Sequence, residues 1–398
     1  MKKRFFGIKI LIVFIVLLSF VVLWSNAVPS EHPRKIVVFK KWFSKIADQE
    51  ALLKNSGAEK IKHLKLINST AVHLPPQVEK ALRKKGEILR IDEDLIISAV
   101  DKKATNKGNS KKHQPSEELP WGIYRIYAEL AWTITKGSTI KVAILDTGID
   151  LDHPDLLDNI KGDINIVKLH KSANDNNGHG THVAGIVAAT DNDIGVIGTG
   201  PEISLYAVEV LDKNGNGWLS DLIDGLDWCI SNNIQVVNMS LGSLKDNQSF
   251  YDAIIKAYQA GITLVASAGN NGDYDGLIEF PAKYPETIAV SAVDEYCQFP
   301  SFSSYGPEID LTAPGVNIKS TYIKASYKTL SGTSMAAAHV TGLVALLLTT
   351  TPTLGYDIDG DGIWDPPEIK KKLKDTAEVL ILLPYQQGAG LARADCIL

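Results

Sequence analysis

The sequence of 398 residues contains only three cysteines, and none belongs to a Cys-x-x-Cys pair. Zinc sites built on paired cysteines are therefore not expected. Cys229, Cys297 and Cys396 allow at most one intramolecular disulfide, and the sequence does not select a pairing. Long apolar runs are also scarce, because after residues 10–24 no segment is long and apolar enough to cross a bilayer. Apolar residues still make up 45% of the chain, enough for one large domain and a smaller one.

Residues 1–27 have the composition of a signal peptide. Lys2, Lys3 and Arg4 form a basic start, an apolar run follows, and Ser25 and Ala27 suit a signal peptidase site. We expect cleavage after Ala27, secretion, and no stable membrane association of the mature protein. The apolar run is near the upper length for a signal peptide, so an uncleaved membrane anchor is the alternative.

The net charge of −5 conceals a division along the chain. Residues 28–115 contain 19 Lys and Arg but 10 Asp and Glu, whereas residues 116–398 contain 18 and 36. The two parts, with net charges of about +9 and −18, should attract each other. A basic region can bind nucleic acid. Here an acidic partner within the same chain is the simpler explanation, and no nucleic acid is expected.

The chain after the signal begins with a pattern typical of a small α+β domain. Strands are predicted at residues 34–40, 62–67, 70–74 and 87–91, and helices at residues 47–55 and 76–85. The order βαββαβ fits a ferredoxin-like domain within residues 28–100. Residues 101–118 contain no apolar side chain larger than alanine, which predicts an exposed linker or processing region.

Residues 119–398 alternate short apolar runs with helical patterns. Strands are expected at residues 140–146, 204–211, 234–241, 262–268 and 287–293. Strands that are apolar throughout are buried on both faces, which indicates a mainly parallel sheet between two helical layers, a three-layer α/β sandwich. In such folds the active site lies at the carboxyl ends of the strands.

Four residues with reactive or polar side chains stand at the ends of predicted strands or at the starts of predicted helices. Asp146 ends one strand and Asn270 follows another, while His179 and Ser334 begin apolar helices. A helix N-terminus and an Asn amide both stabilise negative charge that develops on a substrate oxygen. Each residue alone is more often structural than catalytic. The chain order Asp, His, Ser, with Asn between the last two, favours a serine hydrolase.

The segments LDTGID, HGTHVAG, SAGNNG and GTSMAAAHV resemble the signature segments of the subtilisin family of serine endopeptidases. The resemblance covers residues 117–398 and implies that Ser334 is the nucleophile, His179 the general base and then acid, and Asp146 the residue that orients His179. Asn270 and the Ser334 N–H would form the oxyanion hole. Residues 28–100 would be an inhibitory, self-cleaved propeptide of a monomeric enzyme that acts on polypeptides.

Two other classes of protein fit this sequence less well. A calcium-binding protein that has the fold but lacks activity would show a damaged triad, and none is visible in this sequence. An α/β-hydrolase would carry its serine in a G-x-S-x-G segment, with the chain order Ser, Asp, His. Here the serine comes last, in G-T-S-M.

The resemblance also implies how substrate is bound. The family adds substrate as an antiparallel strand between two segments, here Ser240-Leu241-Gly242 and Gly215-Asn216-Gly217. The pocket for P1, the residue whose carbonyl group is attacked, would be lined by Ala268, Gly269 and residues 278–281. Glu279 stands at the pocket floor, where a carboxylate would favour Lys or Arg at P1. A shorter neighbouring loop leaves open that Glu279 points to solvent.

Residues 357–368, DIDGDGIWDPPE, match the calcium-loop pattern D-x-D-x-D-G-x5-E. An acidic, solvated turn is the alternative to calcium binding. The prolines in and around the loop favour a rigid site over a sensor. The expected ligands of Ca²⁺ in this loop are Asp357, Asp359, Asp361, the Ile363 carbonyl, Asp365 and Glu368. The resemblance alone implies a second calcium site made of Glu117, Asp155, Asn192 and the carbonyls of Thr190, Ile194 and Val196.

Overall fold

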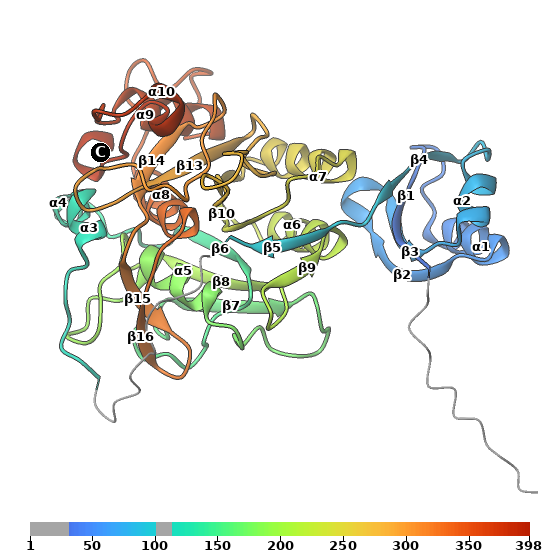
Figure 1. The fold of residues 1–398 in the computed structure, drawn as a ribbon, viewed down its shortest axis with the longest axis horizontal. Helices are drawn as coiled ribbons and strands as arrows, with labels where there is room; N and C mark the ends of the chain where they lie inside the picture. Colours follow the sequence, from blue (N-terminus) through green and yellow to red (C-terminus); the bar gives the residue numbers. More distant parts are fainter. Residues whose placement is uncertain (1–31, 101–113) are drawn as a thin grey trace, which may run out of the picture.

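The structure is a computed structural model that describes residues 32–100 and 114–398 (Figure 1). The expected signal peptide, residues 1–27, and most of the expected linker, residues 101–118, lie outside the described residues. Among the helices of the described residues, none combines the length and apolar character needed to cross a membrane. All three cysteines are free thiols.

The first described segment folds as a small sheet with two helices on one face (blue in Figure 1). Its elements are β1 (Arg34–Phe39), α1 (Ile46–Ser56), β2 (Glu59–Leu64), η1 (Lys65–Ile67), β3 (Ser69–His73), α2 (Pro76–Leu82) and β4 (Ile88–Glu93). The strand order is β2-β3-β1-β4 with antiparallel neighbours, which confirms the expected ferredoxin-like arrangement. Residues 65–67, expected to extend β2, form the short helix η1 instead.

Strand β1 contributes side chains to two separate cores. Val37 and Phe39 pack among the apolar residues of α1 and α2. Ile36 and Val38 belong to a second apolar cluster, which includes residues of the large domain. Because successive strand residues point to opposite faces, the small sheet is covered by its own helices on one face and by the large domain on the other.

The large domain is built on a parallel sheet with the strand order β14-β13-β12-β10-β6-β8-β7. Its strands are β6 (Lys141–Asp146), β7 (Ile160–Asn165), β8 (Ser204–Glu209), β10 (Val236–Met239), β12 (Thr263–Ser267), β13 (Thr287–Val293) and β14 (Leu311–Pro314). The sequence predicted all of these except β7 and β14. Strand β7 lies at the sheet edge and contains Gly162 and Asp163, whereas β14 has only four residues.

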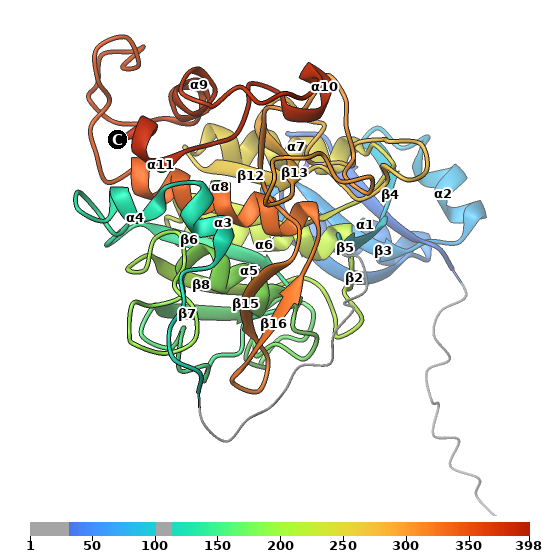
Figure 2. The same cartoon turned by 60° about the vertical axis from the view of Figure 1, so that its left-hand side comes forward.

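Helices cover both faces of this sheet (Figure 2). Val142 and Ile144 of β6 pack on the side of α5 (His179–Ala188) and α8 (Thr333–Leu347). Ala143 and Leu145 pack on the side of α6 (Leu219–Ser231) and α7 (Gln248–Gln259). This confirms the three-layer α/β sandwich. Other elements of the large domain include α3 (Trp121–Arg125), α4 (Ala128–Ala131), β15 (Ile318–Tyr322), β16 (Ser326–Leu330), α9 (Pro366–Asp375), α10 (Pro384–Gln387) and α11 (Ala394–Ile397).

Ion pairs join the small sheet to α6 and α7. Lys62 Nζ lies 2.6 Å from an Asp221 carboxylate oxygen and 3.3 Å from one of Asp224. Arg90 Nη2 lies 2.6 Å from an oxygen of Asp252. These contacts pair basic side chains of the small domain with acidic side chains of the large domain, as the charge division predicts.

Helix η1 provides the apolar centre of this contact, because it packs against both α6 and α7 and buries Ile67. We expect Ile67→Ala to lower the free energy of unfolding by about 2–5 kcal/mol, through lost burial and the cavity left behind. The matched variant Ile46→Ala, at a residue that is 40% exposed, should change it by less than about 0.5 kcal/mol. Urea denaturation of the full chain, with Ser334→Ala to prevent self-cleavage, measures both, and equal effects would contradict the assigned packing.

Candidate active site

Asp146 and His179 are brought together by the end of β6 and the start of α5. His179 Nδ1 lies 2.7 Å from Asp146 Oδ1, and both side chains are buried. The same carboxylate oxygen accepts the Thr147 N–H at 2.7 Å. Helix α5 can approach the strand this closely because residue 180 is glycine. A Cβ atom on Gly180 would lie 2.1 Å from the Gly148 carbonyl oxygen.

Asp175 is a residue of this site that the sequence analysis missed. Its carboxylate accepts five hydrogen bonds of 2.7–3.0 Å, from the Thr147 hydroxyl, the N–H groups of Asn177 and Gly178, and the N–H and hydroxyl of Thr181. Burial raises the pKa of Asp175, and the hydrogen bonds oppose this rise. The carboxylate thus ties the residue after Asp146 to the helix that begins with His179. An acid shortly before an apolar helix was the available signal.

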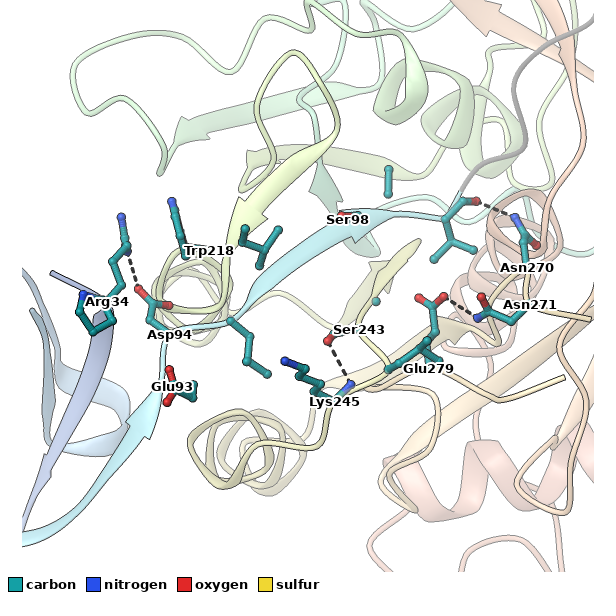
Figure 3. Close-up of a pocket in the computed structure, with 17 residues that line it drawn as sticks. Arg34, Glu93, Asp94, Ser98, Trp218, Ser243, Lys245, Asn270, Asn271 and Glu279 are labelled. Carbon is teal, nitrogen blue, oxygen red and sulfur yellow. Dashed lines mark hydrogen bonds and ion pairs between the residues drawn. The ribbon is translucent and has the colours of Figure 1, made fainter. Parts of the chain in front are cut away.

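Ser334 and Asn270 converge on one carbonyl group. Ser334 is the second residue of α8, and its Oγ donates a hydrogen bond to the Val100 carbonyl oxygen at 2.6 Å. Asn270 Nδ2 donates to the same oxygen at 3.2 Å (Figure 3). Asn270 Oδ1 accepts the Thr333 N–H at 3.1 Å, and this bond turns the amide nitrogen toward Val100. A hydroxyl and an amide from separate elements therefore meet at the carbonyl of residue 100.

The residues before Val100 cross the site as a strand that the sequence did not predict. β5 (Ile96–Ala99) lies between β9 (Asn216–Trp218) and β11 (Leu241–Gly242) and is antiparallel to both. The Ala99 N–H donates to the Gly215 carbonyl at 2.8 Å, and the Val100 N–H donates to the Ser240 carbonyl at 3.2 Å. The two segments expected to bind substrate thus flank β5, with Ser240, Leu241 and Gly242 on one side and Gly215 and Gly217 on the other.

A cavity of about 750 Å³ lies beside Val100, with Gly242, Asn270, Asn271 and Glu279 in its wall (Figure 3). Glu279 Oε1 accepts a hydrogen bond from Asn271 Nδ2 at 2.8 Å. The expected pocket residue Ala268 holds Glu279 from behind, because its carbonyl accepts the Glu279 N–H at 2.9 Å, and the neighbouring Gly269 leaves room for the Glu279 side chain. The carboxylate therefore lines the cavity.

The acidic loop at residues 357–368 gathers part of its expected ligand set. Carboxylate oxygens of Asp357, Asp359 and Asp361 lie within 4.8 Å of one another. The Ile363 N–H donates to Asp361 Oδ1 at 2.7 Å. Asp365 and Glu368 form a capping box at the start of α9, and the other Glu368 carboxylate oxygen accepts the N–H of Ile358, next to Asp357. The spacing D-x-x-E suits both the end of a calcium loop and a capping box.

The second expected calcium site brings its residues together across three segments. Glu117 Oε1 accepts the Asn192 N–H at 2.9 Å, and Asp155 Oδ2 accepts the Val196 N–H at 3.0 Å. Burial, and to a smaller extent the charge of Glu117, raise the pKa of Asp155 to about 7. Asn192 Oδ1 accepts the Ile194 N–H at 3.2 Å. Within the described ranges, no hydrogen bond is made to the carbonyl oxygens of Thr190, Ile194 or Val196.

Comparison with known proteins identifies the family of this chain. The sequence profile of the Subtilase family matches residues 137–393 of this chain. Subtilisin E of Bacillus subtilis is 38% identical over 357 residues, which cover 88% of this chain and 87% of that protein. The thermostable alkaline protease of Halalkalibacterium halodurans is 41% identical over 320 residues, 80% of this chain and 82% of the relative. The M-protease of Shouchella clausii is 39% identical over 338 residues, which cover 85% of this chain and 81% of that protein. The chain therefore belongs to the subtilase family and is a subtilisin-like serine endopeptidase.

Proposed function

We propose that this endopeptidase uses Asp146, His179 and Ser334 as its catalytic triad and is made as a proenzyme that cleaves its own chain after Val100. One observation carries the proposal: the Val100 carbonyl oxygen is 2.6 Å from Ser334 Oγ and 3.2 Å from Asn270 Nδ2. Strand β5 holds this carbonyl in place through antiparallel pairing on both sides. A protein segment thus occupies the cleft as a substrate would.

The triad residues have distinct roles in the proposed reaction. His179 takes the Ser334 proton while Oγ attacks the Val100 carbonyl carbon, and then gives that proton to the leaving nitrogen of residue 101. Water hydrolyses the resulting ester between Ser334 and Val100. Asp146, 2.7 Å from His179 Nδ1, keeps the proton on that nitrogen and stabilises the imidazolium. Burial of both side chains strengthens this charge interaction, because little water screens it.

Asn270 stabilises the oxyanion that forms at the attacked carbonyl. Its amide is already aimed at the Val100 oxygen, because Oδ1 is held by the Thr333 N–H. A donor that needs no reorientation gains most where negative charge develops, and removal of one such donor typically costs about 100- to 1000-fold in turnover. The N-terminus of α8, where Ser334 lies, adds its dipole to the same effect.

After cleavage, residues 28–100 would remain bound as an inhibitory propeptide. Strand β5 blocks the cleft, and the ion pairs of Lys62 and Arg90 with α6 and α7 hold the small domain in place. Asp94 adds a buried contact, because its carboxylate accepts hydrogen bonds from the Ser220 N–H and hydroxyl, both at 2.9 Å. The proposal that the proenzyme is exported rests on the signal-like residues 1–27. The mature enzyme is proposed to be a monomer that cleaves polypeptides.

Calcium is proposed to bind at the acidic loop. The residues present fit the ion: Asp357, Asp359 and Asp361 direct carboxylates to one point, and Asp357 Oδ1 is buried without a hydrogen bond from any described residue. Like charges this close repel one another unless a cation joins them. Bound Ca²⁺ would supply that positive charge and add stability to the folded state. The turns that place the carboxylates use positive φ angles at Gly360 and Gly362.

A second calcium ion is proposed between Glu117, Asp155 and Asn192. The raised pKa of Asp155 marks a buried carboxylate that lacks sufficient positive charge around it. Carbonyl oxygens of residues 190, 194 and 196 have no hydrogen-bond donor among the described residues and are available as neutral ligands. Hard oxygen ligands of this mixed kind suit Ca²⁺.

The self-cleavage proposal is tested by Ser334→Ala. We expect the wild-type chain to accumulate as two fragments separated after Val100, and Ser334→Ala to remain one chain, because no nucleophile attacks the carbonyl. The matched control Ser301→Ala, at an exposed serine, should mature like the wild type. Intact-mass spectrometry of the purified proteins identifies the cut. Maturation of pure Ser334→Ala at the wild-type rate would refute the role of Ser334.

Asp175→Asn tests the positioning of His179. An amide nitrogen cannot accept the two Thr181 hydrogen bonds, so we expect the free energy of unfolding to fall by about 1–3 kcal/mol. We also expect kcat to fall by more than KM rises, because α5 moves relative to Asp146 while the substrate cleft stays intact. The exposed variant Asp158→Asn is the control. An unchanged kcat, measured with a peptide substrate, would leave Asp175 with a structural role only.

Removal of calcium should destabilise the Ser334→Ala protein. A chelator is expected to lower its melting temperature, by about 2–4 °C for each kcal/mol of binding energy lost. Replacing both Asp357 and Asp359 by Asn should shrink this drop, because one proposed site is gone. Asp275→Asn, which removes an acid from another exposed loop, should leave the drop unchanged. A drop of the same size in the double variant would exclude calcium binding at this loop.

A further inference from the structure

We propose that Glu279 makes this enzyme selective for Lys or Arg at P1, a class of substrate that its own junction at Val100 does not represent. The inference rests on the proposed function, because it takes the residue held where Val100 lies to be P1. It concerns the pocket beside the reacting bond and leaves the roles of Asp146, His179 and Ser334 unchanged.

The backbone of the P1 residue is fixed independently of its side chain. The Val100 N–H donates to the Ser240 carbonyl, and its carbonyl oxygen contacts both Ser334 and Asn270. Val100 lines the same cavity as Glu279 and is only 5% exposed. A longer side chain at this position would extend along the cavity that the Glu279 carboxylate lines.

The carboxylate is built into the pocket wall. A Cβ atom on Gly242 would lie 2.4 Å from Glu279 Oε2, and one on Gly269 would lie 3.0 Å from Glu279 Cγ. The Glu279 side chain therefore occupies space that two glycines leave open. Its backbone N–H is bonded to the Ala268 carbonyl, and its Oε1 is bonded to Asn271 Nδ2. Held at both ends, the carboxylate keeps its place along the cavity (Figure 3).

No positive charge balances Glu279 within the described part of the chain, where its one side-chain partner is the neutral amide of Asn271. Burial accordingly raises its pKa. Other charged groups along the cavity are engaged elsewhere, because Arg34 pairs with Asp94 and Glu93 pairs with Lys35. The Lys245 side chain points away from Glu279 in Figure 3. The pocket thus presents an acid with room beside it for a cation.

Valine is a poor match for this pocket. Its methyl groups offer the Glu279 carboxylate neither a hydrogen bond nor a charge, and a partly buried carboxylate without such a partner costs free energy. A Lys or Arg side chain is long enough to extend past the position of the Val100 methyl groups and ends in the charge that the pocket lacks. A buried polar group left unpaired is a strong source of discrimination between substrates, so apolar P1 residues should be disfavoured.

The test compares peptides that differ only at P1, cleaved by the matured enzyme. Lysine is paired with norleucine, which has a similar chain without the amine, and arginine is paired with citrulline. For the wild type we expect kcat/KM to favour each cation by about tenfold or more, as close charge pairs do. Glu279→Gln should bring both ratios close to one. Glu295→Gln removes an acid from an exposed turn outside the cavity and should keep the wild-type ratios.

Self-cleavage after Val100 is measured in the same variants by intact-mass spectrometry. Glu295→Gln should mature at the wild-type rate, and the mass of Glu279→Gln shows whether that variant folds and cleaves itself. Equal rates for lysine and norleucine in the wild type, or unchanged ratios in Glu279→Gln, would overturn the inference. If Glu279→Gln does not fold, the wild-type ratios alone decide. A wild type that neither matures nor cleaves any peptide would instead refute the proposed function.

Discussion

Antiparallel pairing of β5 between β9 and β11 is the constraint on which the active site depends. The bonds from Ala99 to Gly215 and from Val100 to Ser240 fix the register of the strand, and the register fixes where the next carbonyl lies. Because these bonds use main-chain groups, any extended peptide can meet the same geometry. Ser334 and Asn270 can therefore keep one position while the sequence that crosses the cleft varies.

The contacts that bind the small domain to the large domain lie away from Val100. Ile36, Val38 and Ile67 lie in an apolar cluster with α6 and α7, and Lys62 and Arg90 add ion pairs at the same face. Binding energy from such remote contacts can hold a bond at a catalytic centre even when the adjacent side chain fits poorly. In the proposed function, the small sheet docks the domain and the proposed P1 pocket selects the side chain, so the two roles are separate. This separation reconciles Val100 at the proposed cleavage site with a carboxylate in the proposed P1 pocket.

Local signals in the sequence predicted where Asp146 and Asn270 lie. Both follow apolar strands, and parallel strands end at one edge of the sheet, so their placement at that edge could be expected. Strand β5 had no comparable signal, because it has four residues and its partners, such as Asn216, lie more than 100 positions away. Asp175 resembles any loop acid until folding gathers its five donors around it. What the sequence did not reveal is decided by contacts between distant segments.

Net charge predicted the attraction between the two domains but not the residues that form the contact. Although the small domain is basic, two of its acids meet the large domain directly. Asp94 accepts the Ser220 N–H in the first turn of α6, and Asp92 accepts the Ser249 hydroxyl in the first turn of α7 at 2.6 Å. Helix N-termini carry unpaired N–H groups and a partial positive charge, so a carboxylate suits them even where the surrounding surface is acidic. Arg34 lies 2.8 Å from Asp94 and offsets the cost of burying it. The contact between the two domains therefore contains two kinds of interaction. Basic side chains of the small domain pair with acidic side chains, and acidic side chains of the small domain meet helix N-termini. A count of charges detects only the first kind.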